Sequence, residues 1–129
     1  MTAAVGIDVG TTNVKAVLVD GDGVIQASTT RPLQTIARGD SVTQDAGHLW
    51  EQVQTALAFL TRAAPATAAS VGSIGVCSQY SSIVPVGPEG QPVGPMVLWQ
   101  DRRGTTPSFA IMERHPDAFV RWVERHGIP

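Results

Sequence analysis

One stretch near the start of the chain decides the fold: two apolar runs separated by a short polar turn. It reads Gly6-Ile7-Asp8-Val9-Gly10-Thr11-Thr12-Asn13-Val14-Lys15-Ala16-Val17-Leu18-Val19. The branched residues favour β-strands, and Gly10 lets backbone N–H groups approach a ligand closely because glycine has no Cβ. The pattern predicts a β-hairpin whose turn can handle phosphate.

The turn of this hairpin carries residue types that suit phosphate and Mg²⁺. Thr11, Thr12 and Asn13 add hydroxyl and amide donors to successive turn N–H groups, which together can form an anion-binding concavity. Asp8, at the end of the first strand, can hold the water shell of Mg²⁺. An ordinary hairpin with a solvated Asp8 fits the same residues, since short motifs match by chance. Both interpretations stay open on this stretch alone.

Length and composition describe a chain with room for one domain and one core. It has 129 residues, of which 43% are hydrophobic and 16% charged, values ordinary for a globular protein. The net charge of −2 provides no basic field for nucleic acid or an anionic membrane. No secretory leader or membrane-spanning run is recognisable, so we expect a cytoplasmic protein without a nucleic-acid or membrane partner. The single cysteine, Cys77, lies in an apolar strand pattern and is expected to be a small buried hydrophobe.

After the hairpin, the first half of the chain predicts one more strand and a helix. The turn residues at 20–23 precede a third antiparallel strand at residues 24–30, and residues 32–43 show no clear period and are expected to form a surface loop. Apolar residues recur at helical spacing from 46 to 64, with Asp45 as the cap and Pro65 as the stop. We expect Trp50 and Phe59 to pack in the core.

The second half of the chain predicts further strands and two short helices. Residues 65–70 form a connector, and residues 71–77 form a strand parallel to the first one, with both of its faces covered. Extended structure follows at 83–86 and 96–99, and helices are expected at 106–115 and 117–126, the latter ending at Gly127. His48, His115 and His126 have no paired carboxylate in view and are expected to be surface or packing residues.

Polar clusters follow two of these predicted strands and suit a polyol. Ser78-Gln79-Tyr80-Ser81-Ser82 comes after one strand and Trp99-Gln100-Asp101-Arg102-Arg103 ends another, so both can lie at an edge of the sheet. The candidate donors, acceptors and flat apolar surface are Gln79, Tyr80, Ser81, Trp99, Asp101 and Arg102. The alternative is a polar turn at 78–82 and a surface ion pair of Asp101 with Arg102 or Arg103.

The opening hairpin, the turn at 20–23 and the run Leu98-Trp99-Gln100-Asp101-Arg102-Arg103 together resemble the start of an FGGY-family carbohydrate kinase, closest to the xylulokinase type. The resemblance implies an α/β fold of the RNase H-like (actin/hexokinase) type, with a mixed sheet, opening antiparallel hairpins and flanking helices. Such kinases are several times longer. We therefore expect residues 1–129 to correspond to an incomplete first domain, with a missing carboxyl-terminal half or a homo-oligomer as its partner.

The resemblance also implies ligands for both residue sets. ATP and Mg²⁺ would be bound by Asp8, Gly10, Thr11, Thr12, Asn13 and Lys15, with Asp8 as the metal residue, and a sugar or polyol by the second set, with Tyr80 and Ser81 as contacts. No residue is assigned as the catalytic base, which in the family lies far downstream. Xylulokinases have Gln-Met-His and glycerol kinases Gln-Arg-Glu where this chain has Gln79-Tyr80-Ser81, so the sugar is left open. The alternative function is a non-catalytic sugar-binding or regulatory module.

Overall fold

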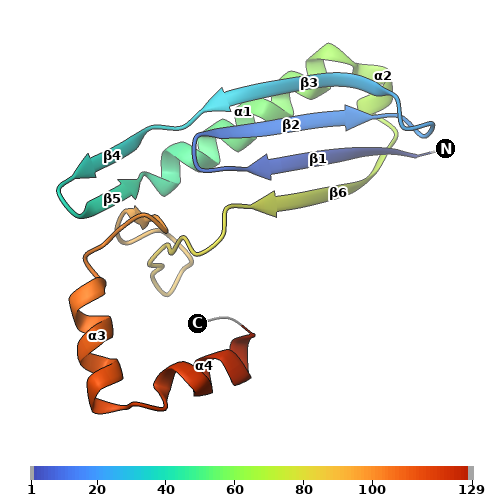
Figure 1. The fold of residues 1–129 in the computed structure, drawn as a ribbon. Helices are drawn as coiled ribbons and strands as arrows, with labels where there is room; N and C mark the ends of the chain where they lie inside the picture. Colours follow the sequence, from blue (N-terminus) through green and yellow to red (C-terminus); the bar gives the residue numbers. More distant parts are fainter. Residues whose placement is uncertain (1, 128–129) are drawn as a thin grey trace.

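The computed structural model describes residues 2–127 and builds the opening stretch into the centre of a four-stranded sheet (Figure 1). β1 (Ala3–Val9) and β2 (Asn13–Val19) form the predicted antiparallel hairpin, and β3 (Ile25–Pro32) pairs antiparallel with β2. β6 (Val71–Ser78) pairs parallel with β1, which gives the strand order β3-β2-β1-β6. The predicted α/β fold with a mixed sheet is therefore confirmed.

The long helix α1 (Ala46–Ala63) covers one face of this sheet. Its cap is the predicted one, since the Asp45 carboxylate accepts hydrogen bonds from the N–H groups of Gly47 and His48. Strand residues alternate between the two faces of a sheet, and three alternate residues in each of β1 and β2 are buried on the face that α1 covers. The core cluster consists of Ala3, Val5, Ile7, Val14, Ala16, Leu18, Ala27, Leu33, Val53, Ala56 and Leu60.

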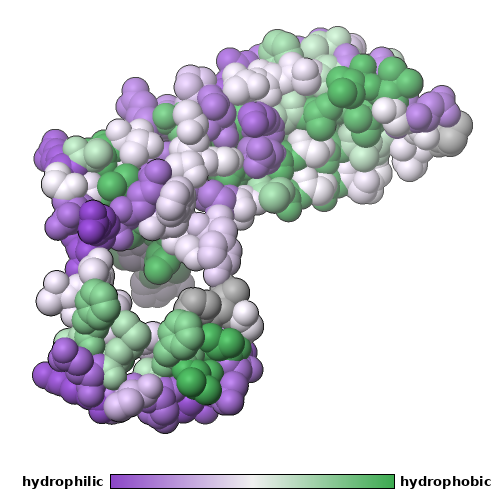
Figure 2. All heavy atoms as spheres, viewed as in Figure 1, coloured by the Kyte–Doolittle hydropathy of each residue, from purple (hydrophilic) through white to green (hydrophobic). Residues whose placement is uncertain are grey.

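The main sheet and α1 confirm one prediction about burial and contradict others. The helix packs against β2 and β3, so β6 lies at the sheet edge beyond its cover. The prediction that β6 is covered on both faces is wrong for this reason. Cys77 was predicted to be buried but is exposed, because it lies beside Asp8 on the face of the sheet opposite α1. Phe59 packs against the core as predicted, whereas Trp50 is exposed on the helix. Figure 2 views the sheet from the side opposite α1, where apolar side chains gather at one end.

A second, smaller sheet replaces the predicted surface loop at 32–43. β4 (Thr35–Arg38) and β5 (Ser41–Gln44) form a tight hairpin, in which Gly39 takes a positive φ of 59° that glycine adopts without strain. β7 (Met96–Val97) completes the order β4-β5-β7. These strands are too short to show a period of two residues, which explains why the sequence pattern missed the hairpin.

The remaining segments connect the sheets and end in two helices. The predicted connector after Pro65 holds one short helix, α2 (Pro65–Ala68), and residues 83–86 contribute only isolated bridges, Ile83 to Val97 and Val86 to Pro92. α3 (Thr105–Arg114) and α4 (Ala118–His126) confirm the two predicted helices, with Gly127 left-handed at the end of α4. They extend from the body as an arm (Figure 1).

Candidate functional site

The site begins where two neighbouring strands end. β1 and β6 run parallel with Val9 beside Ser78, so the turn after β1 and the polar segment after β6 leave the sheet at the same edge. The backbone N–H of Gln79 donates to the carbonyl of Val9 at 2.8 Å, which extends the pairing past the strand end. The prediction that polar residues meet at strand carboxyl ends is confirmed for this pair of segments.

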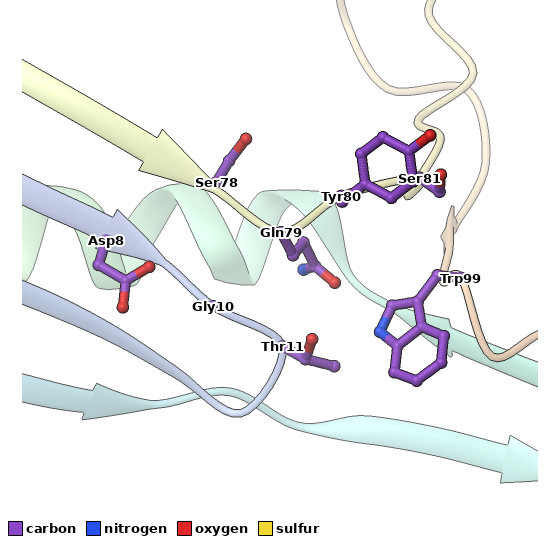
Figure 3. A pocket seen from close by; sticks show the side chains of 8 residues that line it. All are labelled: Asp8, Gly10, Thr11, Ser78, Gln79, Tyr80, Ser81 and Trp99. Carbon is purple, nitrogen blue, oxygen red and sulfur yellow. The ribbon is translucent and has the colours of Figure 1, made fainter. Parts of the chain in front are cut away.

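The turn after β1, the segment after β6 and Trp99, which follows β7, enclose a cleft of about 580 Å³ that is open to solvent. Figure 3 shows the Trp99 indole beside Gln79 and Thr11, with Asp8 further along β1. The residues lining the cleft are Asp8, Gly10, Thr11, Ser78, Gln79, Tyr80, Ser81 and Trp99. Members of both predicted binding sets therefore share one cleft.

The turn between β1 and β2 is held in place through its carbonyl groups. The Thr11 carbonyl accepts from Gln44 Nε2 at 2.6 Å, and the Thr12 carbonyl accepts from the N–H of Leu33 at 2.8 Å. Gly10 donates to the Asn13 carbonyl at 3.0 Å, and a Cβ at Gly10 would lie 3.1 Å from that oxygen. Position 10 therefore favours glycine, and hydrogen bonds from other parts of the protein hold the turn in place. Gly10 and Thr11 border the cleft.

Asp8 supplies the carboxylate of the cleft. Its side chain is 50% exposed and lies 3.8 Å from Lys15 Nζ, its cross-strand neighbour. An exposed ion pair of this length contributes little stability, so the carboxylate is free to take a ligand. Lys15 lies next to Asp8 on the open face of the sheet and does not border the cleft. Among residues 2–127, no group of three or more His, Cys, Asp or Glu side chains gathers as a metal site.

The opposite wall of the cleft combines two exposed aromatic side chains with a constrained turn. Tyr80 and Trp99 are 63% and 58% exposed, so each presents a flat surface to solvent. Ser81 takes a φ of 57°, a left-handed conformation that is uncommon for residues other than glycine and that often marks functional segments. Ser82 Oγ donates to Gln79 Oε1 at 2.9 Å, and Gln79 Nε2 is shielded without a partner in the described chain. This wall offers two aromatic stacking surfaces to a ligand.

Asp101 and Arg102, the two other predicted sugar ligands, do not line the cleft. The Asp101 carboxylate is 3% exposed and accepts from Arg103 Nε and Nη2 at 2.7–3.0 Å and from the N–H of Val42 at 2.9 Å. Hydrogen bonds from Arg103 are the main reason that the pKa of Asp101 lies well below its ordinary value. This is the ion pair of the alternative interpretation, with Arg103 as the partner. Direct sugar binding by Asp101 or Arg102 stays a prediction without geometric support.

Two residues of the site were not among the predicted ligands. Ser78 lines the cleft as the last residue of β6. Its position directly before Gln79, at a predicted strand end, could have indicated this from the sequence. Gln44 is 2% exposed and holds the Thr11 carbonyl from a strand far along the chain. No local sequence signal indicates that contact, because it depends on the β4–β5 hairpin.

Comparison with known proteins places this arrangement in a family. The glycerol kinase of Geobacter sp. (strain M21) is 32% identical over 99% of this chain and 26% of its own length. The xylulose kinase of Streptomyces coelicolor is 32% identical over 95% of this chain and 24% of its own length. The chain thus spans about a quarter of the curated relatives it matches.

Solved structures show the same fold. The xylulose kinase of Rhodospirillum rubrum superposes with a TM-score of 0.80 and 24% identity, covering 96% of this chain and 29% of that one. The Plasmodium falciparum glycerol kinase, solved with ADP, gives a TM-score of 0.79 and 16% identity over 89% of this chain and 24% of its own. No helix in the described part of this chain is both long and apolar enough to cross a membrane. Since the model of the FGGY family of carbohydrate kinases, N-terminal domain, matches residues 3–126, the chain belongs to this carbohydrate kinase family.

Proposed function

We propose that residues 1–129 form the amino-terminal part of an ATP-dependent kinase that transfers the γ-phosphate of ATP to a hydroxyl of a sugar or polyol, such as a xylulose-like ketose. The observation that carries the proposal is the shared cleft: the Gly10–Thr11 turn and Asp8 lie in one cavity with Gln79, Tyr80, Ser81 and Trp99. Phosphoryl transfer needs donor and acceptor aligned at one place, and a single cleft provides that.

The donor side of the cleft fits a phosphate and Mg²⁺. Mg²⁺ binds one or two carboxylates and keeps several waters, and Asp8 offers one half-exposed carboxylate beside the turn. When bound, the ion would neutralise charge on the phosphates. Asp8 would orient the hydrated ion, Gly10 would leave room for the phosphate because it has no side chain, and Thr11, Thr12 and Asn13 would offer turn donors. Lys15 would act through its charge next to Asp8, because it lies on the neighbouring strand.

The acceptor side of the cleft fits a small polyol. The Trp99 and Tyr80 rings offer flat surfaces to C–H groups, and Gln79 and Ser81 bring polar side chains to the same wall. Asp8 is the sole carboxylate among the cleft residues described here, and its proposed role is at the metal. The base that accepts the hydroxyl proton would therefore come from a later part of a longer chain.

Binding of each ligand class to the isolated chain tests the proposal. Glycerol, erythritol, D-xylulose and gluconate are titrated by calorimetry, and MgADP is titrated separately, against the wild type, Trp99→Ala and Asp8→Ala. We expect Trp99→Ala to abolish binding of the preferred polyol only and Asp8→Ala to weaken MgADP only. A chain that binds none of these compounds, or variants that affect the opposite ligand, would contradict the proposal.

A further inference from the structure

We propose that Asp101 and Gln44 are positioning residues, which set the two walls of the cleft relative to each other by anchoring both to the β4–β5 hairpin. The inference rests on the proposed function for its meaning in substrate binding. It gives Asp101 a different role from a sugar ligand. The side chain acts through Trp99, two residues away, and has no contact with the cleft itself.

The first anchor holds the segment that carries Trp99. β7 pairs with β5, with Thr43 beside Val97, and the N–H of Leu98 donates to the Val42 carbonyl at 3.0 Å. On the other side of Trp99, the Val42 N–H donates to Asp101 Oδ2 at 2.9 Å. Trp99 is therefore bracketed by two hydrogen bonds to the same residue of β5.

Asp101 is suited to this task by charge and burial. Both of its oxygens accept from Arg103, and a backbone N–H adds a further bond, so the carboxylate is fully used within the protein. Hydrogen bonds to an ionised acceptor are stronger than neutral ones, so they stabilise the turn that follows Trp99. The N–H of Arg102 donates to the Asp40 carbonyl at 2.9 Å and ties the end of the turn to the hairpin tip.

The second anchor holds the phosphate-binding turn. Gln44 Nε2 donates to the Thr11 carbonyl at 2.6 Å and lies 2.9 Å from Thr35 Oγ1 on β4. The Gln44 side chain is shielded from solvent, and a buried amide donor must keep its acceptor to avoid a desolvation cost. Its amide therefore fixes the position of Thr11, which lines the cleft.

Both anchors sit on one short strand, which makes the hairpin a link between the walls. Val42 and Gln44 are two residues apart in β5 (Ser41–Gln44), roughly 7 Å along a strand. By contrast, the chain that joins β6 to β7 is tied to the Trp99 segment at one bridge, in which Ile83 and Val97 exchange two backbone hydrogen bonds. β5 is the strand that contacts both walls, and loss of either anchor should make the wall that it holds more mobile.

The experiment follows Trp99 in the ligand-free chain. Trp50→Phe and Trp122→Phe leave Trp99 as the one tryptophan, and its fluorescence anisotropy and quenching by acrylamide report its mobility and access. We expect Asp101→Ala to lower the anisotropy and raise the quenching, and Arg103→Ala, which keeps the bond to Val42, to give a smaller change. The matched control is Asp117→Ala, which removes the Asp117–Arg121 ion pair at the start of α4 and should leave both signals at the wild-type level.

A second measurement follows the turn. Amide signals of Gly10, Thr11 and Thr12 in a nitrogen-15 spectrum should broaden or shift in Gln44→Ala and stay in place in Gln54→Ala, an exposed glutamine of α1. If Asp101→Ala is not folded, Arg103→Ala and Gln44→Ala still decide the question.

Unchanged Trp99 signals in folded Asp101→Ala and Arg103→Ala, with only a lower Tm, would overturn the positioning role and leave a stabilising ion pair. Unchanged turn signals in Gln44→Ala would overturn the second anchor. Because neither readout uses a ligand, a failure of polyol binding in the wild type would count against the proposed function alone.

Discussion

The backbone N–H of Gln79 lies 2.8 Å from the carbonyl oxygen of Val9, and this hydrogen bond joins the ends of two strands that are 70 residues apart in the chain. It brings the start of the proposed sugar-binding segment next to the turn proposed to bind phosphate. Phosphoryl transfer needs the attacking hydroxyl and the phosphoryl group side by side, so their two binding segments have to be neighbours.

Asp8→Ala should chiefly lower kcat in a kinase chain that contains this stretch. A residue that orients the metal and the phosphoryl group acts most strongly in the transition state, so we expect a loss of roughly a hundredfold, or about 3 kcal/mol. Steady-state kinetics with the preferred polyol measure it, with KM for the polyol nearly unchanged. A rise in polyol KM at constant kcat would instead assign Asp8 to the acceptor side.

Tyr80→Ala and Trp99→Ala should raise the polyol KM and leave the KM for ATP nearly unchanged. Their rings would contact the acceptor in ground and transition state alike, and losing one such surface should cost about tenfold, or about 1.4 kcal/mol. Initial rates at varied polyol and ATP concentrations separate the two constants. Val86→Ala, at an exposed apolar residue outside the cleft, is the control.

The isolated 129-residue chain should show no sugar kinase turnover. Asp8 is the one carboxylate that borders the described cleft, and its proposed role is at the metal rather than as a base. A coupled assay of ADP release with a panel of pentoses, ketoses and polyols measures the rate. Turnover above background that disappears in Asp8→Ala would show that these residues suffice for catalysis.

The Asp101 ion pair should stabilise the fold at neutral pH and lose its effect in acid. Because Arg103 lowers the pKa of Asp101 in the folded state, the unfolded chain takes up the proton first as the pH falls. The stabilisation is therefore complete above the unfolded pKa, near 3.9, and declines as the pH drops further below it. Urea unfolding at pH 7, 4 and 2.5 measures the difference in unfolding free energy between the wild type and Asp101→Asn. This difference should shrink as the pH falls. A difference that is equal at all three values would contradict the ion-pair assignment.

The isolated chain should self-associate through the uncovered edge of its main sheet. β6 is an edge strand, and its Val76 is 66% exposed because α1 covers β2 and β3 instead. Unpaired strand edges with apolar side chains favour association, so light scattering should report a dimer or a larger species. Val76→Lys should shift the chain toward monomer, whereas Val86→Lys, outside the sheet, should not. A wild-type monomer at high concentration would refute this prediction.

Local patterns determined the elements of the main sheet and its helix. The two apolar runs around Gly10 predicted the β1–β2 hairpin, and helical spacing with Asp45 as the cap predicted α1, because strand alternation and helix capping depend on neighbours in sequence. The same holds for Gly127, whose left-handed conformation ends α4 as expected. The sequence also placed the polar residues after β6 at a strand end.

Tertiary structure alone decided how these parts meet. The parallel register of β1 and β6 places Val9 beside Ser78, and it places Cys77 beside Asp8 on the face opposite α1, where it is exposed. Asp101 was predicted to bind the sugar but pairs with Arg103, and the reason is of the same kind. One Asp in a motif can bind a ligand or a neighbouring Arg, and the choice depends on the Val42 N–H, which comes from a hairpin nearly 60 residues away. Contacts between distant segments leave no periodic trace in sequence, so only the folded chain reveals them.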